Sequence, residues 1–308
     1  MLGAVAESRA VVDPRVALTP AQMTSLVVDC FGWPRADVED RLRRERACSG
    51  WNVASDLVER GVPPFVWSGA MGAFYATTRA FIYELLVYNA QPERLLLRER
   101  LLALVQTEQA RVATRPLSVL LWGDGLGFDA LAVAQALPEA EVTYYEISEL
   151  SSAFAARLFA SAGASRIRMV RALDPGDAAR HDVVAAMDVM EHVPDPAVWV
   201  RDVAGVLRPG GVAAIKEAFD AVIASRPTHL RDSAWRYAYR TPRLFEDAGF
   251  VTERYGNFPY IFRLGHGTPA PLGARLHYHL STPVKLARIL PRLLRRPDPV
   301  AFLRGCSS

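Results

Sequence analysis

The sequence feature that most constrains this chain is a glycine-rich turn near its centre. Residues 117–131 read LSVLLWGDGLGFDAL, an apolar run followed by Gly123, Gly125 and Gly127 and then by an apolar helical pattern. This order predicts a buried strand, a tight turn and a helix. Glycines permit backbone angles that a Cβ would resist, and the start of the helix offers free N–H groups to a ligand. A nucleotide-binding pocket in an α/β fold is therefore expected here.

Two further segments support this interpretation. The strand predicted over residues 141–147 ends in Glu146, about 20 residues after the turn, where a carboxylate can accept both hydroxyls of a ribose. Residues 181–217 read HDVVAAMDVMEHVPDPAVWVRDVAGVLRPGGVAAIKE. The chain resembles the class I S-adenosylmethionine (SAM) dependent methyltransferases here, because their strand, EHV turn, helix, LxPGG turn and further strand recur in the same order. The resemblance covers residues 115–256.

The resemblance implies a Rossmann-like, doubly wound, seven-stranded, mostly parallel sheet with an N-terminal helical domain. It implies SAM as the cofactor and S-adenosylhomocysteine as its product. NAD is the alternative cofactor, but nicotinamide dehydrogenases carry GxGxxG and lack the LxPGG turn. The cofactor contacts implied are Gly123, Asp124, Gly125, Gly127, Glu146, Ile147, Asp174, Met187 and Asp188.

One position departs from the pattern of these methyltransferases. Leu121, two residues before the first glycine, stands where an Asp or Glu commonly helps to hold the methionine end of the cofactor. Asp124, inside the turn, is expected to take part of that role. The departure leaves open a degenerate, non-catalytic SAM-binding protein, although Glu146 and the LxPGG turn are intact.

The catalytic candidates follow the predicted strand at residues 182–187, because open α/β sheets bind ligands at the carboxyl ends of their strands. A hydroxyl acceptor must lose its proton during methyl transfer. His192 is the candidate base, because imidazole accepts a proton near neutral pH, and Glu191 lies beside it. A structural role for His192 is the alternative. Some relatives with EH at this turn hold a divalent metal there, which makes a metal site at Glu191 and His192 a further alternative. No metal is expected, because a metal needs more ligands, His229 is isolated in the sequence and no further ligand cluster follows.

Residues 1–114 are predicted to form a helical segment, with one amphipathic helix over residues 70–89 and another over residues 93–112. In small-molecule methyltransferases that the core resembles, such a segment serves as a substrate lid or as a homodimer interface, and the sequence leaves both open. Its candidates for lining an apolar pocket, with helix packing as the alternative, are Trp51, Phe65, Trp67 and Tyr75.

Residues 115–268 form the predicted SAM-binding domain, followed by a basic C-terminal extension at residues 269–308. Within the domain, residues 218–240 are long enough to cover the pocket. Their candidate substrate contacts, with surface packing as the alternative, are His229, Trp235, Tyr237 and Tyr239. The extension interleaves arginines with leucines. It is predicted to pack its leucines against the N-terminal helices. The alternatives are peripheral membrane contact through residues 284–296, an acidic partner or nucleic acid.

Composition narrows the class of function. A net charge of +3 in 308 residues implies no large electrostatic attraction to nucleic acid. Cys30, Cys48 and Cys306 are widely spaced and odd in number, which favours reduced thiols in the cytoplasm over disulfides or a zinc site. No stretch of 18 apolar residues predicts a membrane span, and no signal peptide is expected.

The expected activity is methyl transfer to O, N or C of a small-molecule acceptor, in the setting of specialised metabolism. The alternatives are an RNA or protein methyltransferase, which would need a broad basic face, and a protein that binds SAM without transferring its methyl group.

Overall fold

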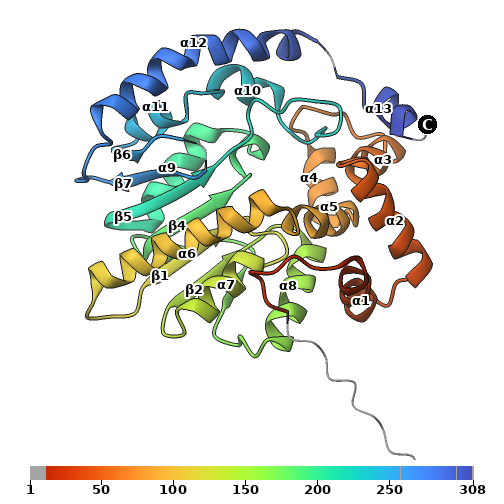
Figure 1. Cartoon of the computed structure of the whole chain (residues 1–308), viewed down its shortest axis with the longest axis horizontal. Helices are drawn as coiled ribbons and strands as arrows, with labels where there is room; N and C mark the ends of the chain where they lie inside the picture. The colour runs from red at the N-terminus through yellow and green to blue at the C-terminus, as the bar shows by residue number, and fades with distance from the viewer. Residues whose placement is uncertain (1–11, 257, 296, 307–308) are drawn as a thin grey trace, which may run out of the picture.

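The apolar runs predicted as strands pair in one seven-stranded sheet (Figure 1). The structure is a computed structural model that describes residues 12–256, 258–295 and 297–306. The strand order is β3-β2-β1-β4-β5-β7-β6, and β7 runs antiparallel to both of its neighbours. The strands are β1 (Ser118–Trp122), β2 (Glu141–Tyr145), β3 (Arg168–Val170), β4 (His181–Met187), β5 (Leu207–Lys216), β6 (Phe250–Arg254) and β7 (Tyr260–Leu264). The predicted Rossmann-like, mostly parallel sheet is therefore confirmed.

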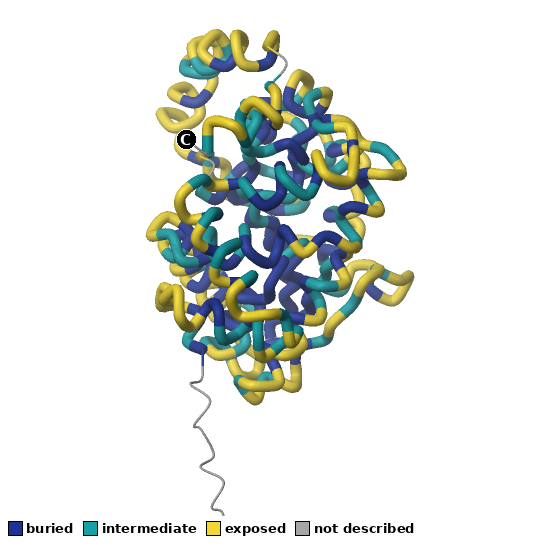
Figure 2. Tube along the Cα trace, turned by 90° about the vertical axis from the view of Figure 1, so that its right-hand side faces the viewer, coloured by how far each residue is buried: buried dark blue, intermediate teal, exposed yellow. Residues whose placement is uncertain are grey.

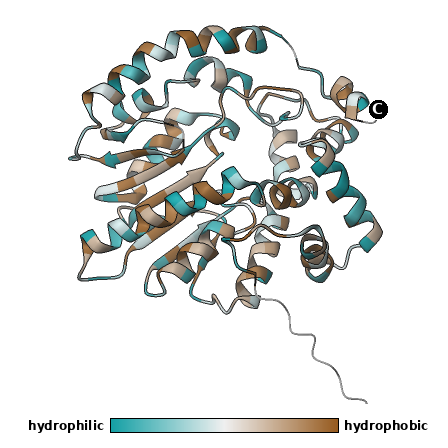
Figure 3. Cartoon of the chain, viewed as in Figure 1, coloured by the Kyte–Doolittle hydropathy of each residue, from teal (hydrophilic) through white to brown (hydrophobic). Residues whose placement is uncertain are grey.

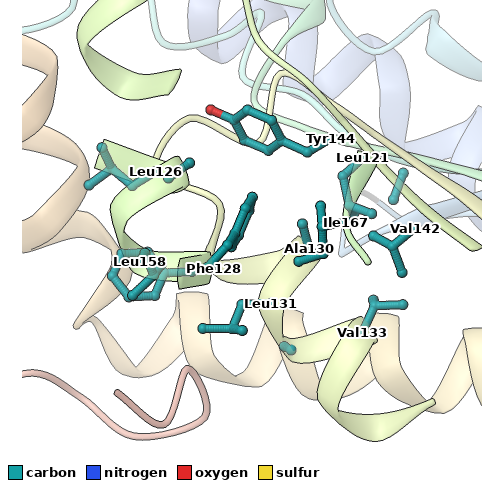
Figure 4. Packing of buried hydrophobic residues seen from close by; sticks show 14 of the residues in the cluster. Leu121, Leu126, Phe128, Ala130, Leu131, Val133, Val142, Tyr144, Leu158 and Ile167 are labelled. Carbon is teal, nitrogen blue, oxygen red and sulfur yellow. The ribbon is translucent and has the colours of Figure 1, made fainter. Parts of the chain in front are cut away.

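Helices cover both faces of the sheet. One layer contains α6 (Pro92–Val112), α7 (Phe128–Ala136) and α8 (Glu149–Ser161), and the other contains α9 (Pro196–Val206), α10 (Arg231–Tyr237) and α11 (Thr241–Glu246). Leu121 packs into the first layer and Leu120 into the second, because side chains alternate along a strand. Figure 4 shows Leu121 and Val142 near Ala130 and Val133 of α7. Both faces of β1 are therefore apolar, as a doubly covered parallel strand requires (Figure 3).

A bundle of helices lies at one end of the sheet, drawn red to orange in Figure 1. It contains α1 (Pro20–Phe31), α2 (Arg35–Ala47), α3 (Trp51–Glu59), α4 (Gly69–Thr77) and α5 (Ala80–Asn89). The single helix predicted over residues 70–89 is broken at Thr78, whose backbone is extended and whose hydroxyl accepts a hydrogen bond from the N–H of Ala80 at 3.0 Å.

The predicted helical segment, residues 1–114, does not act as one unit. Its last helix, α6, packs on α7 and β4 and so belongs to a layer of the sheet. The bundle proper therefore ends with α5, and residues 1–11 of the predicted segment lie outside the described residues.

The C-terminal extension contains a long helix, α12 (Leu272–Leu294), which contacts α10. Ile289 and Leu293 of α12 are buried in the core of the second layer. The prediction that the leucines pack against the N-terminal helices is therefore wrong, because α12 lies along the other side of the sheet (Figure 1). Much of α12 is exposed, as Figure 2 shows, and its exposed apolar residues are Leu272, Leu276, Leu280, Val284, Leu290 and Leu294. Within the described ranges, no helix is both long and apolar enough to span a membrane.

The last helix, α13 (Pro299–Cys306), returns to the bundle and packs on α3. There Cys306 forms a disulfide with Cys48, 258 positions earlier in the sequence. The prediction of reduced thiols is wrong for these two cysteines, because their separation in the sequence gives no sign that the chain end returns to its first helices. Cys30 is a free thiol.

Gly127 sets how closely α7 and α8 approach. Its φ is +82°, and a Cβ there would lie 2.6 Å from Cζ of Phe159 and 2.9 Å from Cβ of Ala155. Gly163 has a similar φ of +67°, but a Cβ there would meet nothing within 4 Å.

We expect Gly127→Ala to lower the free energy of unfolding by about 2–4 kcal/mol, because backbone strain adds to overpacking. Gly163→Ala, which carries the backbone cost without the overlap, should lose about 1 kcal/mol. Urea denaturation of both variants measures the difference. Equal losses would show that the contact with Phe159 does not constrain α7.

Candidate functional site

The glycine turn forms one wall of a cavity of about 270 Å³ between the sheet and the bundle. Gly123 and Gly125 line it with φ of +67° and +57°. A Cβ on Gly123 would lie 2.8 Å from Val189, and one on Gly125 would lie 2.7 Å from Leu85. These two glycines therefore keep the backbone open to a ligand. Gly127 does not line the cavity, which differs from its predicted role as a cofactor contact, because its position is needed for packing against α8.

Glu146 follows β2 and faces the same space. Its carboxylate accepts hydrogen bonds from the N–H groups of Gly125 at 3.0 Å and Ser148 at 2.9 Å. Burial raises its pKa, and these backbone hydrogen bonds partly oppose the rise. A second cavity, of about 430 Å³, adjoins the first. The walls of both include Tyr75, Gly123, Glu146, Asp188 and His192. Glu146 therefore lies where the two spaces meet, in a position to accept the hydroxyls of a ribose.

Asp124 lines the cavity, but its carboxylate is occupied by the helix that follows. It accepts from the N–H of Asp129 at 3.2 Å and from that of Ala130 at 2.8 Å. Burial and the charge of Asp129 raise the pKa of Asp124 to about 8. Leu121, at the position of the usual acidic residue, is buried in the core. Asp124 therefore caps the helix, and its role toward the cofactor stays a prediction.

Arg94 offers the charge that the turn itself lacks. Arg94 and Arg98, both on α6, bind the buried Asp129 at 2.5 Å and 2.7 Å. Arg98 also donates to Pro14 and Asn89, whereas Nη1 of Arg94 is buried without a hydrogen-bond partner and Arg94 lines the cavity. Two guanidinium groups against one carboxylate leave a local positive charge. Arg94 is therefore suited to bind a carboxylate, such as that at the methionine end of SAM.

The other wall follows β4 and β5. Met187 and Asp188 line the cavity, and Asp188 forms an ion pair with Lys216 at the end of β5. Tyr88 of α5 donates to Asp188 at 2.6 Å. Burial opposes ionisation of Asp188, but the charge of Lys216 holds its pKa below the ordinary value. The hydrogen bond from Tyr88 to Asp188 therefore connects the bundle to the sheet directly beside the cavity.

A second connection joins the bundle to the segment after β5. Arg226 pairs with Glu84 of α5 at 2.6 Å, and both residues line the cavity. Burial raises the pKa of Glu84 to about 7. Sequence analysis missed Glu84 and Arg226. The signal for Glu84 was available, because it is the sole charged residue in the apolar run AFIYELLVYN.

The predicted catalytic pair lies in the short helix η2 (Met190–His192). Glu191 and His192 both line the cavity, and His229 lies beside them. Nδ1 of His192 is 2.6 Å from the hydroxyl of Tyr75 and 3.2 Å from the carbonyl of Thr228. Burial lowers the pKa of His192 to about 4 and raises that of Glu191 well above its ordinary range.

The other predicted cofactor and substrate contacts differ in whether they line a cavity. Ile147 lines the second cavity. Asp174 lines neither cavity, because its carboxylate caps the short helix η1 (Pro175–Asp177) by accepting from the N–H of Gly176 at 2.7 Å. Trp235 and Tyr237 also lie outside both cavities, since they belong to α10. Tyr239 instead lines a separate space of about 110 Å³, where its hydroxyl donates to Asp220.

Of the predicted substrate contacts, His229 alone lines the first cavity, beside the glycine turn. The aromatic candidates of the bundle divide in a similar way. Tyr75 lines both cavities and Trp67 lines the second, whereas Phe65 is buried in the second hydrophobic layer. The guanidinium of Arg44 lies 4.7 Å from the ring centroid of Trp51, away from the site.

A doubly wound sheet with a glycine turn after its first strand and a carboxylate after its second defines a Rossmann-like nucleotide-binding domain. Residues 122–213 match the sequence model of a family described as a methyltransferase domain. This stretch of the chain therefore carries a methyltransferase domain, which supports the resemblance to the class I SAM-dependent methyltransferase family. SAM is the cofactor of that family, and the open glycine turn, Glu146 and Arg94 fit it.

Two curated relatives are ubiquinone biosynthesis O-methyltransferases. That of Marinobacter nauticus is 50% identical over 40 residues, which is 13% of this chain and 17% of the relative. That of Leptothrix cholodnii is 34% identical over 91 residues, 28% of this chain and 39% of the relative. The matches thus span less than two fifths of the length of either relative.

A solved structure of Burkholderia thailandensis 1,6-didemethyltoxoflavin-N1-methyltransferase, with 1,6-didemethyltoxoflavin and S-adenosylhomocysteine bound, has a TM-score of 0.44 to this chain. It is 17% identical and covers 70% of this chain and 88% of its own. This likeness concerns the fold alone.

We expect Glu146→Ala to weaken SAM binding at least roughly tenfold, because two hydroxyls would lose a charged acceptor. Titration calorimetry with SAM and with S-adenosylhomocysteine measures the loss. Glu149→Ala, which removes an exposed carboxylate three residues away, is the matched control. An unchanged affinity of Glu146→Ala for SAM would show that the cofactor pocket is assigned wrongly.

Arg94→Met should also weaken SAM binding about tenfold or more, because the methionine carboxylate would lose a buried charged donor. The variant should bind 5′-methylthioadenosine, which lacks that carboxylate, as the parent does. Glu146→Ala should weaken both ligands. If Arg94→Met weakened both ligands equally, Arg94 would act through the fold and not through the carboxylate.

Proposed function

We propose that this chain is a SAM-dependent methyltransferase that transfers a methyl group to a hydroxyl oxygen of a small-molecule acceptor. The observation that carries the proposal is the cavity beside the glycine turn, which is roofed by the bundle and has Glu191 and His192 in its wall. The partial relatives, which are O-methyltransferases, support oxygen over nitrogen or carbon.

The lining of the cavity favours a small acceptor. The bundle contributes Tyr75, Phe81, Leu85 and Tyr88, which form an apolar and aromatic roof. Ligand pockets for small molecules are commonly apolar with a few placed polar groups. A macromolecular acceptor would have to displace this roof, which is joined to the rest of the chain by the pairs of Tyr88 with Asp188 and of Arg226 with Glu84.

The charges of the site also disfavour RNA as the acceptor. RNA binding requires cations that are free to contact phosphates. In the cavity, Lys216 and Arg226 each pair with a carboxylate, and Arg94 is buried beside Asp129. The site therefore offers no continuous basic surface, and an RNA or protein acceptor stays the alternative without a structural observation in its favour.

The chemistry required is an in-line displacement, and SAM supplies the methyl group already activated on a sulfonium. The acceptor oxygen forms a bond to the methyl carbon while the carbon–sulfur bond breaks and its electron pair stays on sulfur. The hydroxyl proton must leave, and His192, neutral at pH 7, and Glu191 face the same space. The aromatic roof excludes water from the reacting groups.

Location and partners belong to the same proposal. Cytoplasmic location stays a prediction, and the Cys48–Cys306 disulfide is a bond more typical of oxidising compartments. A homodimer also stays a prediction. So does peripheral membrane contact through residues 284–296, where exposed Val284, Leu290 and Leu294 lie among basic residues; Arg296 is outside the described residues.

We expect the purified full chain to methylate hydroxylated aromatic compounds in the presence of SAM, with one S-adenosylhomocysteine formed per methyl transferred. Mass spectrometry of a panel of phenols and catechols, matched anilines, transfer RNA and peptides measures the choice of acceptor. Glu146→Ala at limiting SAM is the negative control. Methylation confined to RNA or peptides, or SAM binding without transfer to any acceptor class, would reject the proposed function.

A further inference from the structure

The helix α12 presents an apolar face to the outside of the molecule. Its inner side is anchored, because Tyr278, Ile289 and Leu293 are buried in the second layer. The opposite side carries large apolar side chains that recur every four or six residues, which places them within about 120° of one another around the helix. We call this face the outer stripe, and its exposed members are Leu272, Leu276, Leu280, Val284, Leu290 and Leu294.

The outer stripe is continuous along the helix. Pro283, Ala287 and Pro291 fall within the same sector and are also exposed, and no polar side chain of α12 interrupts it. The helix has 23 residues, so the stripe is about 34 Å long. It begins well before the segment 284–296 that the sequence indicated and follows the outer edge of the molecule (Figure 1).

The charges of α12 have one sign. The helix contains no aspartate or glutamate. Arg288 and Arg292 are exposed on one side of the outer stripe and Arg275 on the other. An apolar face flanked by cations is typical of a helix that lies in the interface of a membrane, because anionic lipid headgroups attract the cations while the apolar side chains enter the acyl region.

Two other occupants fit this surface less well. A second copy of the chain, packed stripe against stripe, would bring the arginines of both helices together without an acidic residue on either helix. Nucleic acid would pair with the arginines but would leave the leucines in water. A bilayer with anionic lipids matches both the apolar stripe and its cations.

We propose that the outer stripe of α12 docks on a membrane that contains anionic lipids. The helix lies along the surface, with its leucines at the boundary of headgroups and acyl chains and with Arg288 and Arg292 on lipid phosphates. The inner side of α12 stays packed on the domain, so docking requires no unfolding of the helix.

The docked helix is connected to the cavity beside the glycine turn. The guanidinium of Arg231, the first residue of α10, donates to the carbonyl of Leu293 at 2.7 Å. The preceding residue, Leu230, donates its N–H to the carbonyl of Glu191 at 2.8 Å. Residues 230–231 therefore join α12 to the wall of the cavity.

The test is flotation of the purified full chain with vesicles of phosphatidylcholine alone and with vesicles of phosphatidylcholine mixed with phosphatidylglycerol. We expect binding to the mixed vesicles to be at least roughly tenfold stronger at low salt and to weaken as salt is added. Neither SAM nor an acceptor is present, so failure of the proposed function would leave this result unaffected.

Leu280→Gln should weaken binding to the mixed vesicles roughly tenfold, because it removes a leucine that is 76% exposed at the centre of the outer stripe. Leu96→Gln, which removes an exposed leucine of α6, is the matched control and should bind as the parent does. Both side chains are on the surface, so neither change should disturb the fold.

The double variant Arg288→Gln with Arg292→Gln should lose about tenfold or more in binding to the mixed vesicles and bind phosphatidylcholine as the parent does. Its control, Arg35→Gln with Arg43→Gln, removes two exposed arginines of α2 and changes the net charge equally. The control pair should leave vesicle binding unchanged.

Three results would overturn the proposal. The first is absence of binding to the mixed vesicles, or equal binding to both kinds of vesicle. The second is equal binding by the parent and Leu280→Gln. The third is a dimer in sedimentation of the parent without vesicles that Leu280→Gln abolishes, because the outer stripe would then serve a second copy of the chain.

Discussion

The buried carboxylate of Asp129 is a point at which α6, the glycine turn and the end of the helical bundle are joined. It lies in the first turn of α7, directly after the glycine turn, and receives Arg94 and Arg98 from α6. Arg98 in turn reaches the carbonyl of Pro14 and the side chain of Asn89 at the end of α5. Two buried cations depend on one anion, so loss of Asp129 would leave both uncompensated. One buried carboxylate thus links the turn to α6 and, through Arg98, to α5 and Pro14.

This arrangement explains how the site works without the acidic residue usual before the first glycine. Leu121 can be apolar because it points into the core between β1 and α7, where a carboxylate would be unpaired. The charged group beside the cavity is instead on α6, where Nη1 of Arg94 has no hydrogen-bond partner in the protein. Asp124 is then available to cap α7, which stabilises the helix that carries Asp129. With Leu at position 121, the charge that faces the cavity from this side comes from Arg94 of α6, and the glycine turn still lines the cavity.

The features that could be predicted from sequence are those encoded locally. The glycine turn, β1 and Glu146 follow one another within a short stretch, so apolar periodicity and turn chemistry identify them. Features created by contacts between distant segments were missed. Thr78 breaks a regular helical pattern by bonding to Asp56 in another helix, and Cys306 reaches Cys48 only because α13 returns to α3. Spacing along the chain carries no trace of either.

The two sides of the cavity differ in how their charged groups are paired. On the cofactor side, Asp129 pairs with two arginines, Asp188 with Lys216 and Glu146 with backbone N–H groups, while Nη1 of Arg94 has no hydrogen-bond partner. On the acceptor side, Glu191 and His229 are buried and unmatched. Burial raises the pKa of Glu191 well above its ordinary range, which favours the neutral acid in that wall. Polar atoms without a hydrogen-bond partner therefore face the cavity from both sides, Nη1 of Arg94 on one side and Glu191 and His229 on the other, so the cavity offers polar contacts at both ends.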